Sequence, residues 1–150
     1  MLLMKTALFA FASLLLVSLA PAQDLPEGKG KDITEKTCTA CHGMEAVTSM
    51  HVAKDAWTDV VNDMRSRGAD GTNADFDNII AYLAKYFGPE VNVNKAAAKE
   101  LESLDITSDE SAAIVKYRTD KGSIKDFADL SKVPGLDAKK LEPLKSRLKF

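Results

Sequence analysis

Cys38-Thr39-Ala40-Cys41-His42 is the stretch from which the fold and chemistry of this 150-residue chain can be worked out. It has the form C-x-x-C-H, the attachment motif of a c-type haem. Each cysteine thiol can add to one vinyl group of the porphyrin, and two intervening residues let both sulfurs reach neighbouring rings from one helical turn. The adjacent imidazole then becomes the proximal ligand of the iron. The motif therefore predicts one covalent haem c, held by Cys38 and Cys41 and ligated by His42.

Three other uses of these residues compete with haem. A thioredoxin-type C-x-x-C belongs to a βαβ context, and this sequence does not alternate strands with helices. A disulfide between cysteines so close together would close too small a loop to stabilise the fold much. Adjacent cysteine and histidine residues suit a tetrahedral zinc cage poorly, and the chain has no second C-x-x-C or H-x-x-x-H pair. A zinc site would have to use the chain's complete set of cysteines and histidines, Cys38, Cys41, His42 and His51.

The first 22 residues have the layout of a secretory signal peptide. Lys5 supplies a positive charge, residues 6–20 form an almost unbroken apolar run, and Ala20-Pro21-Ala22 is a small-x-small cleavage site. A membrane anchor is the alternative, but the run is shorter than the roughly 20 apolar residues that a bilayer requires. We therefore expect export to the periplasm or another extracytoplasmic space, where haem c is attached, and no stable membrane anchor after cleavage.

Charge divides the remaining chain into two parts. Residues 23–88 carry 7 Lys/Arg against 11 Asp/Glu, a balance of −4, whereas residues 89–150 carry 12 against 11, a balance of +1. The change coincides with Gly88-Pro89, a stop signal after an apolar periodic segment. We expect a domain boundary there, so that a domain over 23–88 is followed by a second domain over 89–150.

Residues 23–88 have the apolar periodicity of helices. A short helix over about 28–37 leads into the haem motif, and Gly30 is placed to allow a close helix crossing. Residues 45–54 are expected to form a loop. Two amphipathic helices follow, and Thr72 or Asn73 can cap the second. Their apolar stripes are Ala53, Trp57, Val60, Val61 and Met64 in the first, and Phe76, Ile79, Ile80, Leu83 and Phe87 in the second.

With these residues in place, the stretch from about 28 to 88 resembles a small class I-type cytochrome c. That family has an N-terminal helix carrying C-x-x-C-H, a middle region that supplies the sixth ligand, and a C-terminal helix that crosses the first. Gly30, eight residues before Cys38, matches the glycine of the family's helix crossing, and Tyr82 and Leu83 fall where its C-terminal helix packs. The resemblance implies an electron carrier rather than an enzyme. The chain departs from the family in having no proline between 27 and 88.

Three residues are candidates for the sixth ligand of the iron. Met64 is the first choice, because it lies 22 residues after His42 and precedes the last helix, as the ligand methionine does in the resembling family. It also continues the apolar stripe of Trp57, which would make it a core residue. His51 and Met50 are the alternatives, because at roughly 3.3 Å per extended residue either could wrap the porphyrin edge. An open sixth site would instead suit a haem enzyme of the peroxidase type.

Residues 89–150 are predicted to be helical as well. The whole chain is therefore expected to be all-α, with a small cytochrome c-like haem domain followed by a four- to five-helix domain. In the second domain, Asn94 is expected to cap a first helix whose apolar face is Ala97, Leu101 and Leu104. A turn over 105–108 leads to a helix over 112–118 that ends near Gly122, and a short helix with Phe127 and Leu130 follows. The last helix is expected to be capped by Asp137 and to break or kink at Pro143.

About 60 residues of this second part resemble a tandem helix-hairpin-helix domain. In DNA-binding members, hairpin glycines bring backbone N–H groups close to a phosphate, and the following helix N-terminus favours the anion. The residues that fit the family pattern are Asn92, Asn94, Leu101, Leu104, Ala113, Ile114, Tyr117, Arg118, Gly122, Phe127, Leu130, Val133, Pro134, Gly135 and Leu136.

The hairpins depart from the DNA-binding pattern. The first hairpin has no glycine and carries Asp105 and Asp109, and in the second Asp137 replaces the second glycine. Lys139 and Lys140 compensate only in part, because the domain as a whole lacks the basic patch typical of nucleic-acid binding. We therefore expect this domain to dock onto a partner protein, with nucleic acid the less favoured ligand.

Together these observations predict an exported monohaem cytochrome c that carries single electrons between redox partner proteins in the periplasm. The acidic haem domain favours a partner with a basic docking surface. Two alternatives belong to other classes. One is a haem-bearing DNA-binding protein of the helix-hairpin-helix type, and the other is a haem enzyme with an open sixth site.

Overall fold

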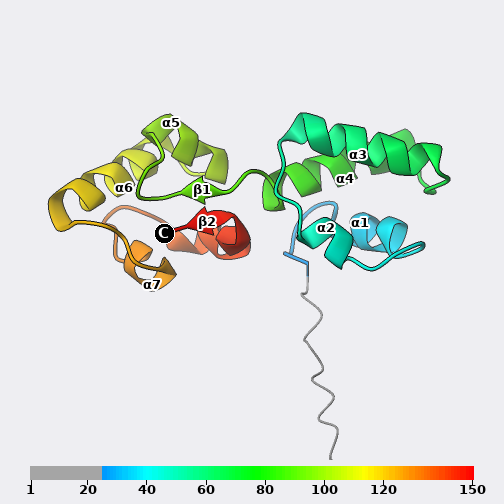
Figure 1. The fold of residues 1–150 in the computed structure, drawn as a ribbon. Coiled ribbons are helices and arrows are strands. Elements are labelled where there is room, and N and C mark those ends of the chain that lie inside the picture. The colour runs from blue at the N-terminus through cyan, green and yellow to red at the C-terminus, as the bar shows by residue number, and fades with distance from the viewer. Residues whose placement is uncertain (1–24) are drawn as a thin grey trace, which may run out of the picture.

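The computed structural model describes residues 25–150, so the expected signal peptide over 1–22 lies outside the described residues. The described chain is almost entirely helical, which confirms the all-α class (Figure 1). None of the helices within 25–150 combines the length and apolarity needed to traverse a bilayer. The elements are α1 (Lys31–Cys38), α2 (Glu45–Thr48), α3 (Lys54–Ser66), α4 (Asn73–Tyr86), β1 (Val91–Asn92), α5 (Ala98–Leu101), η1 (Glu102–Leu104), α6 (Ser108–Lys121), α7 (Phe127–Leu130), η2 (Ala138–Arg147) and β2 (Leu148–Lys149).

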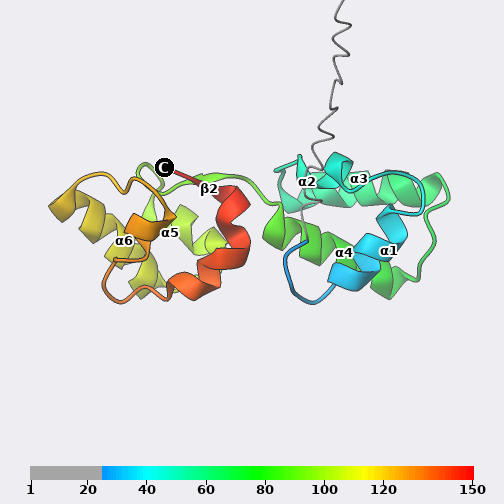
Figure 2. The same ribbon diagram turned by 90° about the horizontal axis from the view of Figure 1, so that it is seen from below.

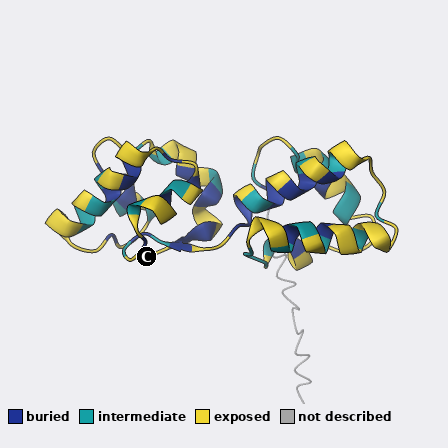
Figure 3. Cartoon of the chain, turned by 90° about the horizontal axis from the view of Figure 1, so that it is seen from above, coloured by how far each residue is buried: buried dark blue, intermediate teal, exposed yellow. Residues whose placement is uncertain are grey.

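The elements gather into two halves that follow one another along the chain. In both views, α1–α4 lie together on one side, and the elements from β1 to β2 lie together on the other (Figures 1 and 2). Buried residues line the inner faces of the helices within each half, and exposed residues cover the outside (Figure 3). The buried apolar side chains of the two halves form one continuous cluster, and one short segment after α4 joins the halves.

The N-terminal half is built on α4, whose start and apolar face the sequence predicts correctly. Thr72 caps the helix in a capping box, in which its hydroxyl accepts a bond from the Asp75 N–H and the Asp75 carboxylate accepts one from the Thr72 N–H. The Thr72 hydroxyl also donates to the Asp75 carboxylate at 2.7 Å, and the bonds that this carboxylate accepts from the Thr72 N–H and hydroxyl lower its pKa. α3 packs against α4 with Trp57 and Val61 buried, whereas Ala53 is exposed at the N-cap and is not part of the apolar stripe.

Helix α1 crosses α4 at the glycine that the sequence singles out. Gly30 precedes α1 with a φ of 97°, and a Cβ added there would lie 2.8 Å from the carbonyl oxygen of Asn78 and 2.9 Å from the Cβ of Tyr82. Only glycine fits so close a crossing with a left-handed backbone. The predicted close approach is thus confirmed, and it fixes where α1 begins with respect to α4. The expected loop over 45–54 is wrong in its first part, because α2 forms one short helical turn there.

The C-terminal half differs from the expectation at its entry. Asn94 does not cap a helix; its amide group instead donates to the carbonyl oxygen of Ile124 and accepts from the N–H of Ile124, both at 2.8 Å. Helix α5 begins only at Ala98, and Ala97 is exposed at its N-cap. The entry segment forms β1, which pairs in parallel with β2 so that Val91 lies opposite Leu148. The ladder closes this half by joining its two ends.

Three further helices of the C-terminal half lie where the sequence places them. α6 is longer than the predicted 112–118 and begins with a second capping box, formed by Thr107 and Glu110. α7 matches the short helix expected around Phe127 and Leu130. Asp137 caps η2 by accepting a bond from the Lys139 N–H, and Pro143 lies inside this 3₁₀ helix without ending it.

The backbone carbonyl groups of residues 85–89, here called the junction carbonyls, connect the two halves. From the C-terminal half, Arg147 donates to the carbonyl oxygens of Lys85 at 2.8 Å and Pro89 at 3.1 Å, and Ser146 donates to that of Tyr86 at 3.5 Å. The same guanidinium also donates to the Ser103 carbonyl oxygen at 3.2 Å. Arg147 is only 3% exposed, so its charge is buried and satisfied by these oxygens.

The N-terminal half binds the same row of carbonyl oxygens from the other side. The indole N–H of Trp57 donates to the Phe87 oxygen at 2.9 Å, and the Val52 N–H donates to it at 3.2 Å. The ring nitrogen Nδ1 of His51 lies 3.2 Å from the Gly88 oxygen. All five junction carbonyls therefore accept hydrogen bonds, and the segment is held by side chains of both halves.

Candidate functional site

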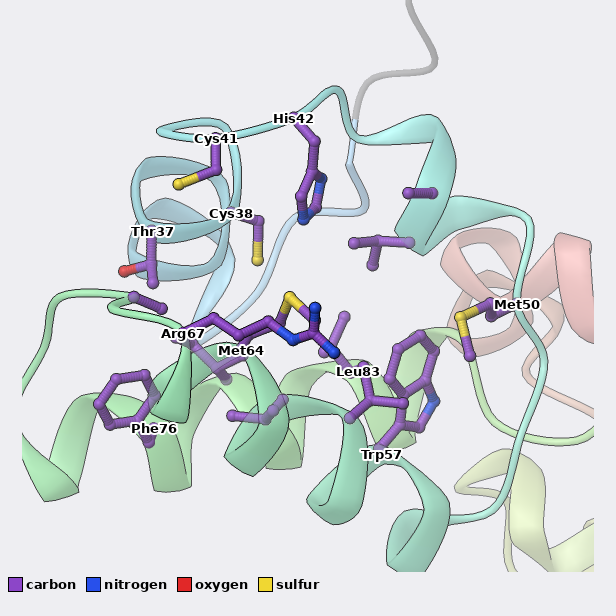
Figure 4. Close-up of a pocket in the computed structure, with 16 residues that line it drawn as sticks. Thr37, Cys38, Cys41, His42, Met50, Trp57, Met64, Arg67, Phe76 and Leu83 are labelled. Carbon is purple, nitrogen blue, oxygen red and sulfur yellow. The ribbon is translucent and has the colours of Figure 1, made fainter.

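The N-terminal half encloses an apolar cavity of about 520 Å³ between α1, α2, α3 and α4. The cysteine motif enters it from the α1 side, and α3 and α4 form the opposite wall (Figure 4). The lining residues are Thr37, Cys38, Cys41, His42, Ala46, Val47, Met50, Trp57, Val60, Val61, Met64, Arg67, Ala69, Phe76, Ile79 and Leu83.

The motif residues reach the cavity because α1 ends at Cys38. Thr39 closes the helix by donating its N–H to the Glu35 oxygen, and the chain then turns so that Cys41 and His42 follow at the rim. Both cysteines are free thiols. Cys38 is half-buried, and this burial raises the pKa of its thiol, whereas Cys41 is exposed. The two sulfur atoms thus offer one attachment point inside the cavity and one at its edge.

The backbone carbonyl group of the next residue, Gly43, orients the imidazole of His42. Its Nδ1 lies 3.0 Å from the carbonyl oxygen of Gly43. Because a carbonyl oxygen can only accept, this contact requires the proton on Nδ1 and leaves the lone pair on Nε2. The ring points toward the interior of the cavity (Figure 4). This is the tautomer and direction that a metal-ligating histidine needs, with the second nitrogen fixed by a hydrogen bond.

Met64 lies on the wall opposite His42. It comes from the last turns of α3, and its sulfur points toward the space beneath the imidazole (Figure 4). Met50 also lines the cavity but lies farther along it, beyond Trp57. His51 does not line the cavity; its ring contacts the Gly88 oxygen and lies 6.2 Å from the ring of Phe87. Of the three sixth-ligand candidates, the structure brings both methionines to the site and turns the histidine away.

Trp57 and Arg67 are two lining residues of contrasting character. Trp57 is fully buried and forms part of the wall, as expected of a core or pocket residue. Arg67 was not singled out by the sequence, yet it is the one lining residue with a permanent charge. Its Nε donates to the Asp63 carboxylate at 2.9 Å. Its position three residues after Met64 is the signal that could have placed it on the same side of α3.

The geometry fits a flat apolar cofactor that is anchored by thiols. The cavity walls are mostly aliphatic and aromatic, two thiols lie three residues apart at a helix end, and a correctly oriented imidazole lies opposite a thioether sulfur. These are the donors and the lining that a haem c requires. A zinc cage needs several thiolate, imidazole or carboxylate ligands at one point. Within residues 25–150, no three Cys, His, Asp or Glu side chains come together as such a group.

The C-terminal half contains two hairpins, each made of two helical segments joined by a turn. In the first, η1 ends at Asp105, which has a φ of 61°, and α6 follows. The Asp105 carboxylate accepts a bond from the Lys85 ammonium on α4 at 3.0 Å, so this turn lies next to the N-terminal half. In the second hairpin, α7 leads through Gly135, with a φ of 83°, into η2. A Cβ at Gly135 would have no neighbour within 4 Å, so the second turn is open to solvent.

Glu110 links the two hairpins from the first turn of α6. Its carboxylate accepts bonds from the Thr107 N–H at 2.8 Å, from the Asp137 N–H at 3.2 Å and from the Lys140 ammonium at 3.0 and 3.2 Å. These bonds, led by that from Thr107, outweigh burial and lower the pKa of Glu110 to about 2. The pattern T-x-x-E reveals the capping box in the sequence, but the contacts with the second hairpin depend on the fold.

Residues 88–149 match the family described as the helix-hairpin-helix motif. This finding supports the resemblance of the C-terminal half to that family. The matched segment, here called the helix-hairpin-helix segment, begins two residues after the end of α4 and includes both hairpins. The match does not extend into the N-terminal half, whose resemblance to a cytochrome c stays a prediction. Neither the curated proteins nor the solved structures yielded a significant match.

Proposed function

We propose that this protein is an exported c-type cytochrome that carries single electrons between redox partner proteins. The observation that carries the proposal is the apolar cavity into which Cys38, Cys41 and His42 converge, with Met64 on the opposite wall. Haem c, when bound, supplies an iron that alternates between the ferric and ferrous states. The protein is thus a carrier rather than an enzyme.

The residues of the site divide the work of holding such a cofactor. Cys38 and Cys41 anchor it through thioether bonds, and His42 presents Nε2 because the Gly43 oxygen holds the proton on Nδ1. Met64 offers its sulfur from the facing wall, with Met50 as the alternative from within the cavity. The buried indole of Trp57 and the aliphatic walls give the site an apolar lining. An apolar surrounding and a methionine ligand both favour a high reduction potential.

The cellular setting follows from the first 22 residues of the sequence. A cleaved signal peptide over these residues would deliver the chain to the periplasm or a comparable compartment, where covalent haem attachment takes place. The excess of acidic residues in 23–88 supports redox partners with a basic docking surface. In this proposal the helix-hairpin-helix segment docks the carrier to a partner protein.

An absorption spectrum of the exported, purified protein tests the proposal. Reduction with dithionite should give the narrow α-band of low-spin haem c, and the oxidised protein should show the weak far-red band of iron–methionine sulfur ligation, an expectation from the cytochrome family. Met64→Ala should abolish the far-red band, and the matched control Met50→Ala should leave it in place. A high-spin spectrum that shifts on addition of cyanide would point to a haem enzyme, and absence of haem would refute the proposal.

Nucleic-acid binding is the second candidate function, and the family match at residues 88–149 favours it. Taken alone, that match supports a DNA-binding helix-hairpin-helix protein more directly than it supports electron transfer. Against it stand the near-neutral charge of 89–150 and the carboxylates at both hairpins. A mobility-shift assay with duplex DNA at low salt decides between them, because binding that weakens steeply with added salt would establish this second function.

A further inference from the structure

The second hairpin has donors of the kind found in anion sites, and two of them bind one carboxylate from the first hairpin. The Asp137 N–H at the start of η2 and the ammonium of Lys140 both bind Glu110. A backbone N–H from the first hairpin, that of Thr107, binds the same carboxylate. Backbone N–H groups at the start of a helix together with a lysine are the donor set with which proteins bind phosphate.

The carboxylate that receives these bonds is buried between the hairpins. Glu110 is only 6% exposed, and its two oxygen atoms share four donated bonds. A buried carboxylate needs such compensation, and these bonds supply it. The site is therefore satisfied within the chain, and a phosphate could enter only by displacing a carboxylate that is tethered to the same helix.

We propose that Glu110 occupies the anion-binding position of the helix-hairpin-helix segment from within the chain, and that it thereby excludes phosphate groups from the second hairpin. This makes Glu110 a specificity-determining residue for the whole C-terminal half. The inference concerns this half alone and does not depend on what fills the cavity of the N-terminal half.

The first hairpin offers no second place for a phosphate. The Asp105 N–H donates to the Glu102 oxygen at 3.1 Å, and the Asp105 side chain is paired with Lys85. Its turn thus presents a carboxylate beside the N-terminal half, where a phosphate would be repelled. The second turn, by contrast, is open around Gly135. At this second turn the Glu110 carboxylate binds the Asp137 N–H and Lys140, and the Asp137 carboxylate binds the Lys139 N–H.

Substitution Glu110→Gln in the full exported chain tests this inference. Glutamine retains the capping box, because its side-chain oxygen can accept from the Thr107 N–H, but it no longer satisfies Lys140 with a charge. Inorganic phosphate is the probe, and thermal unfolding is followed at constant ionic strength with chloride as the reference anion. Phosphate should raise the unfolding temperature of Glu110→Gln, with an affinity at least about tenfold above that of the wild type.

Three further variants make the test specific. Glu100→Gln is the matched control, because it removes the same charge from an exposed site of α5 and should leave the phosphate response at the wild-type level. Adding Lys140→Met to Glu110→Gln should remove the gained response. Glu110→Ser provides the same readout with a shorter neutral side chain, which keeps the test decisive if the glutamine variant folds poorly.

Two results would overturn the inference. One is a wild-type protein that binds phosphate as tightly as Glu110→Gln does. The other is a folded Glu110→Gln or Glu110→Ser protein whose phosphate response equals that of Glu100→Gln. Neither result bears on the haem spectrum, so failure of this inference and failure of the proposed electron-transfer function can be told apart.

Discussion

The two halves of the molecule are of similar length, but they differ in how completely side chains fill their interiors. The N-terminal half leaves a cavity of about 520 Å³ among its apolar side chains. The C-terminal half fills its centre with Leu101, Leu104, Ile114 and Leu141, all fully buried, and holds its turns with buried polar side chains. The difference teaches that the C-terminal half is filled by its own side chains, whereas the N-terminal half leaves room for a ligand.

The cavity is too large to be an incidental packing defect. At about 24 cal/mol per Å³, an empty enclosed cavity of this size would cost roughly 12 kcal/mol, which is comparable to the whole stability of a domain. Because the cavity opens to solvent at the rim near His42, this figure is an upper bound. We therefore expect a ligand bound in the cavity to stabilise the N-terminal half.

The largest expected effect therefore comes from removing both anchors of the cofactor. In the double variant Cys38→Ser with Cys41→Ser, mass spectrometry should show no covalent haem on the exported protein. Amide hydrogen exchange should then lose most of its protection over α1, α3 and α4, while α6 and η2 keep theirs. Unchanged protection in α3 and α4 would show that the two halves do not differ in the way described.

The next effect concerns the connection between the halves. Arg147→Met leaves the carbonyl oxygens of Lys85, Pro89 and Ser103 without this donor, and a loss of roughly 3 kcal/mol is expected. Urea unfolding of the variant should separate into two transitions, one for each half.

Arg118→Met is the matched control for the junction. Arg118 also binds two carbonyl oxygens, those of Val93 and Ala96, but both belong to the C-terminal half. The control should weaken that half without separating the transitions. Two variants with the same single transition and the same midpoint would contradict a junction role for Arg147.

A smaller effect on the free energy of unfolding is expected when the pH is lowered. Glu110 is the main titrating group of the C-terminal half in this range. Its folded-state pKa of about 2 lies below its ordinary value of 4.5, so the unfolded chain binds more protons between these values. The stability from Glu110 is therefore fully present above pH 4.5 and is lost as the pH falls toward 2, a change on the order of 1 kcal/mol after allowance for solvent screening.

Unfolding measured between pH 5 and pH 2 checks this expectation. Glu110→Gln should flatten the decline in stability of the C-terminal half over this window. Asp75, whose pKa is also lowered, should act in the same direction in the N-terminal half. A decline that is equally steep in the wild type and in Glu110→Gln would count against the assigned role of Glu110.

The smallest effect compares the two capping boxes directly. Thr72→Ala and Thr107→Ala should each cost about 1 kcal/mol, because each removes the side-chain acceptor of a helix N-terminus. Thermal unfolding should show the Thr72 loss in the N-terminal half and the Thr107 loss in the C-terminal half. A shift of both halves by either variant would mean that the junction couples them tightly.

Features that depend on neighbours along the chain could be predicted from the sequence. The cap at Thr72, the buried stripe of α4 and the helix crossing at Gly30 follow from residue type and spacing alone. The motif residues Cys38, Cys41 and His42 and the methionine Met64, all singled out from the sequence, line one cavity, and their roles as haem ligands stay a prediction.

Features that depend on distant partners were missed. Two-residue strands such as β1 and β2 have too little length for any periodicity to show, so the ladder between Val91 and Leu148 was not expected. Asn94 was assigned to a cap because asparagine suits one, yet its partner is Ile124, thirty residues away. The contacts of Arg147 with the junction likewise cross the whole second half, and no local pattern marks them.

The row of junction carbonyls has a consequence for any partner that docks on the C-terminal half. Because Trp57 and His51 bind these carbonyl oxygens from the N-terminal half and Arg147 binds them from the C-terminal half, the linker between the cavity and the hairpins is rigid. A flexible linker would let a docked molecule sample many distances from the cavity, whereas a rigid linker holds the cavity at one distance and one angle. The effective concentration of the cavity at a partner docked on the C-terminal half is then set by this fixed distance and angle.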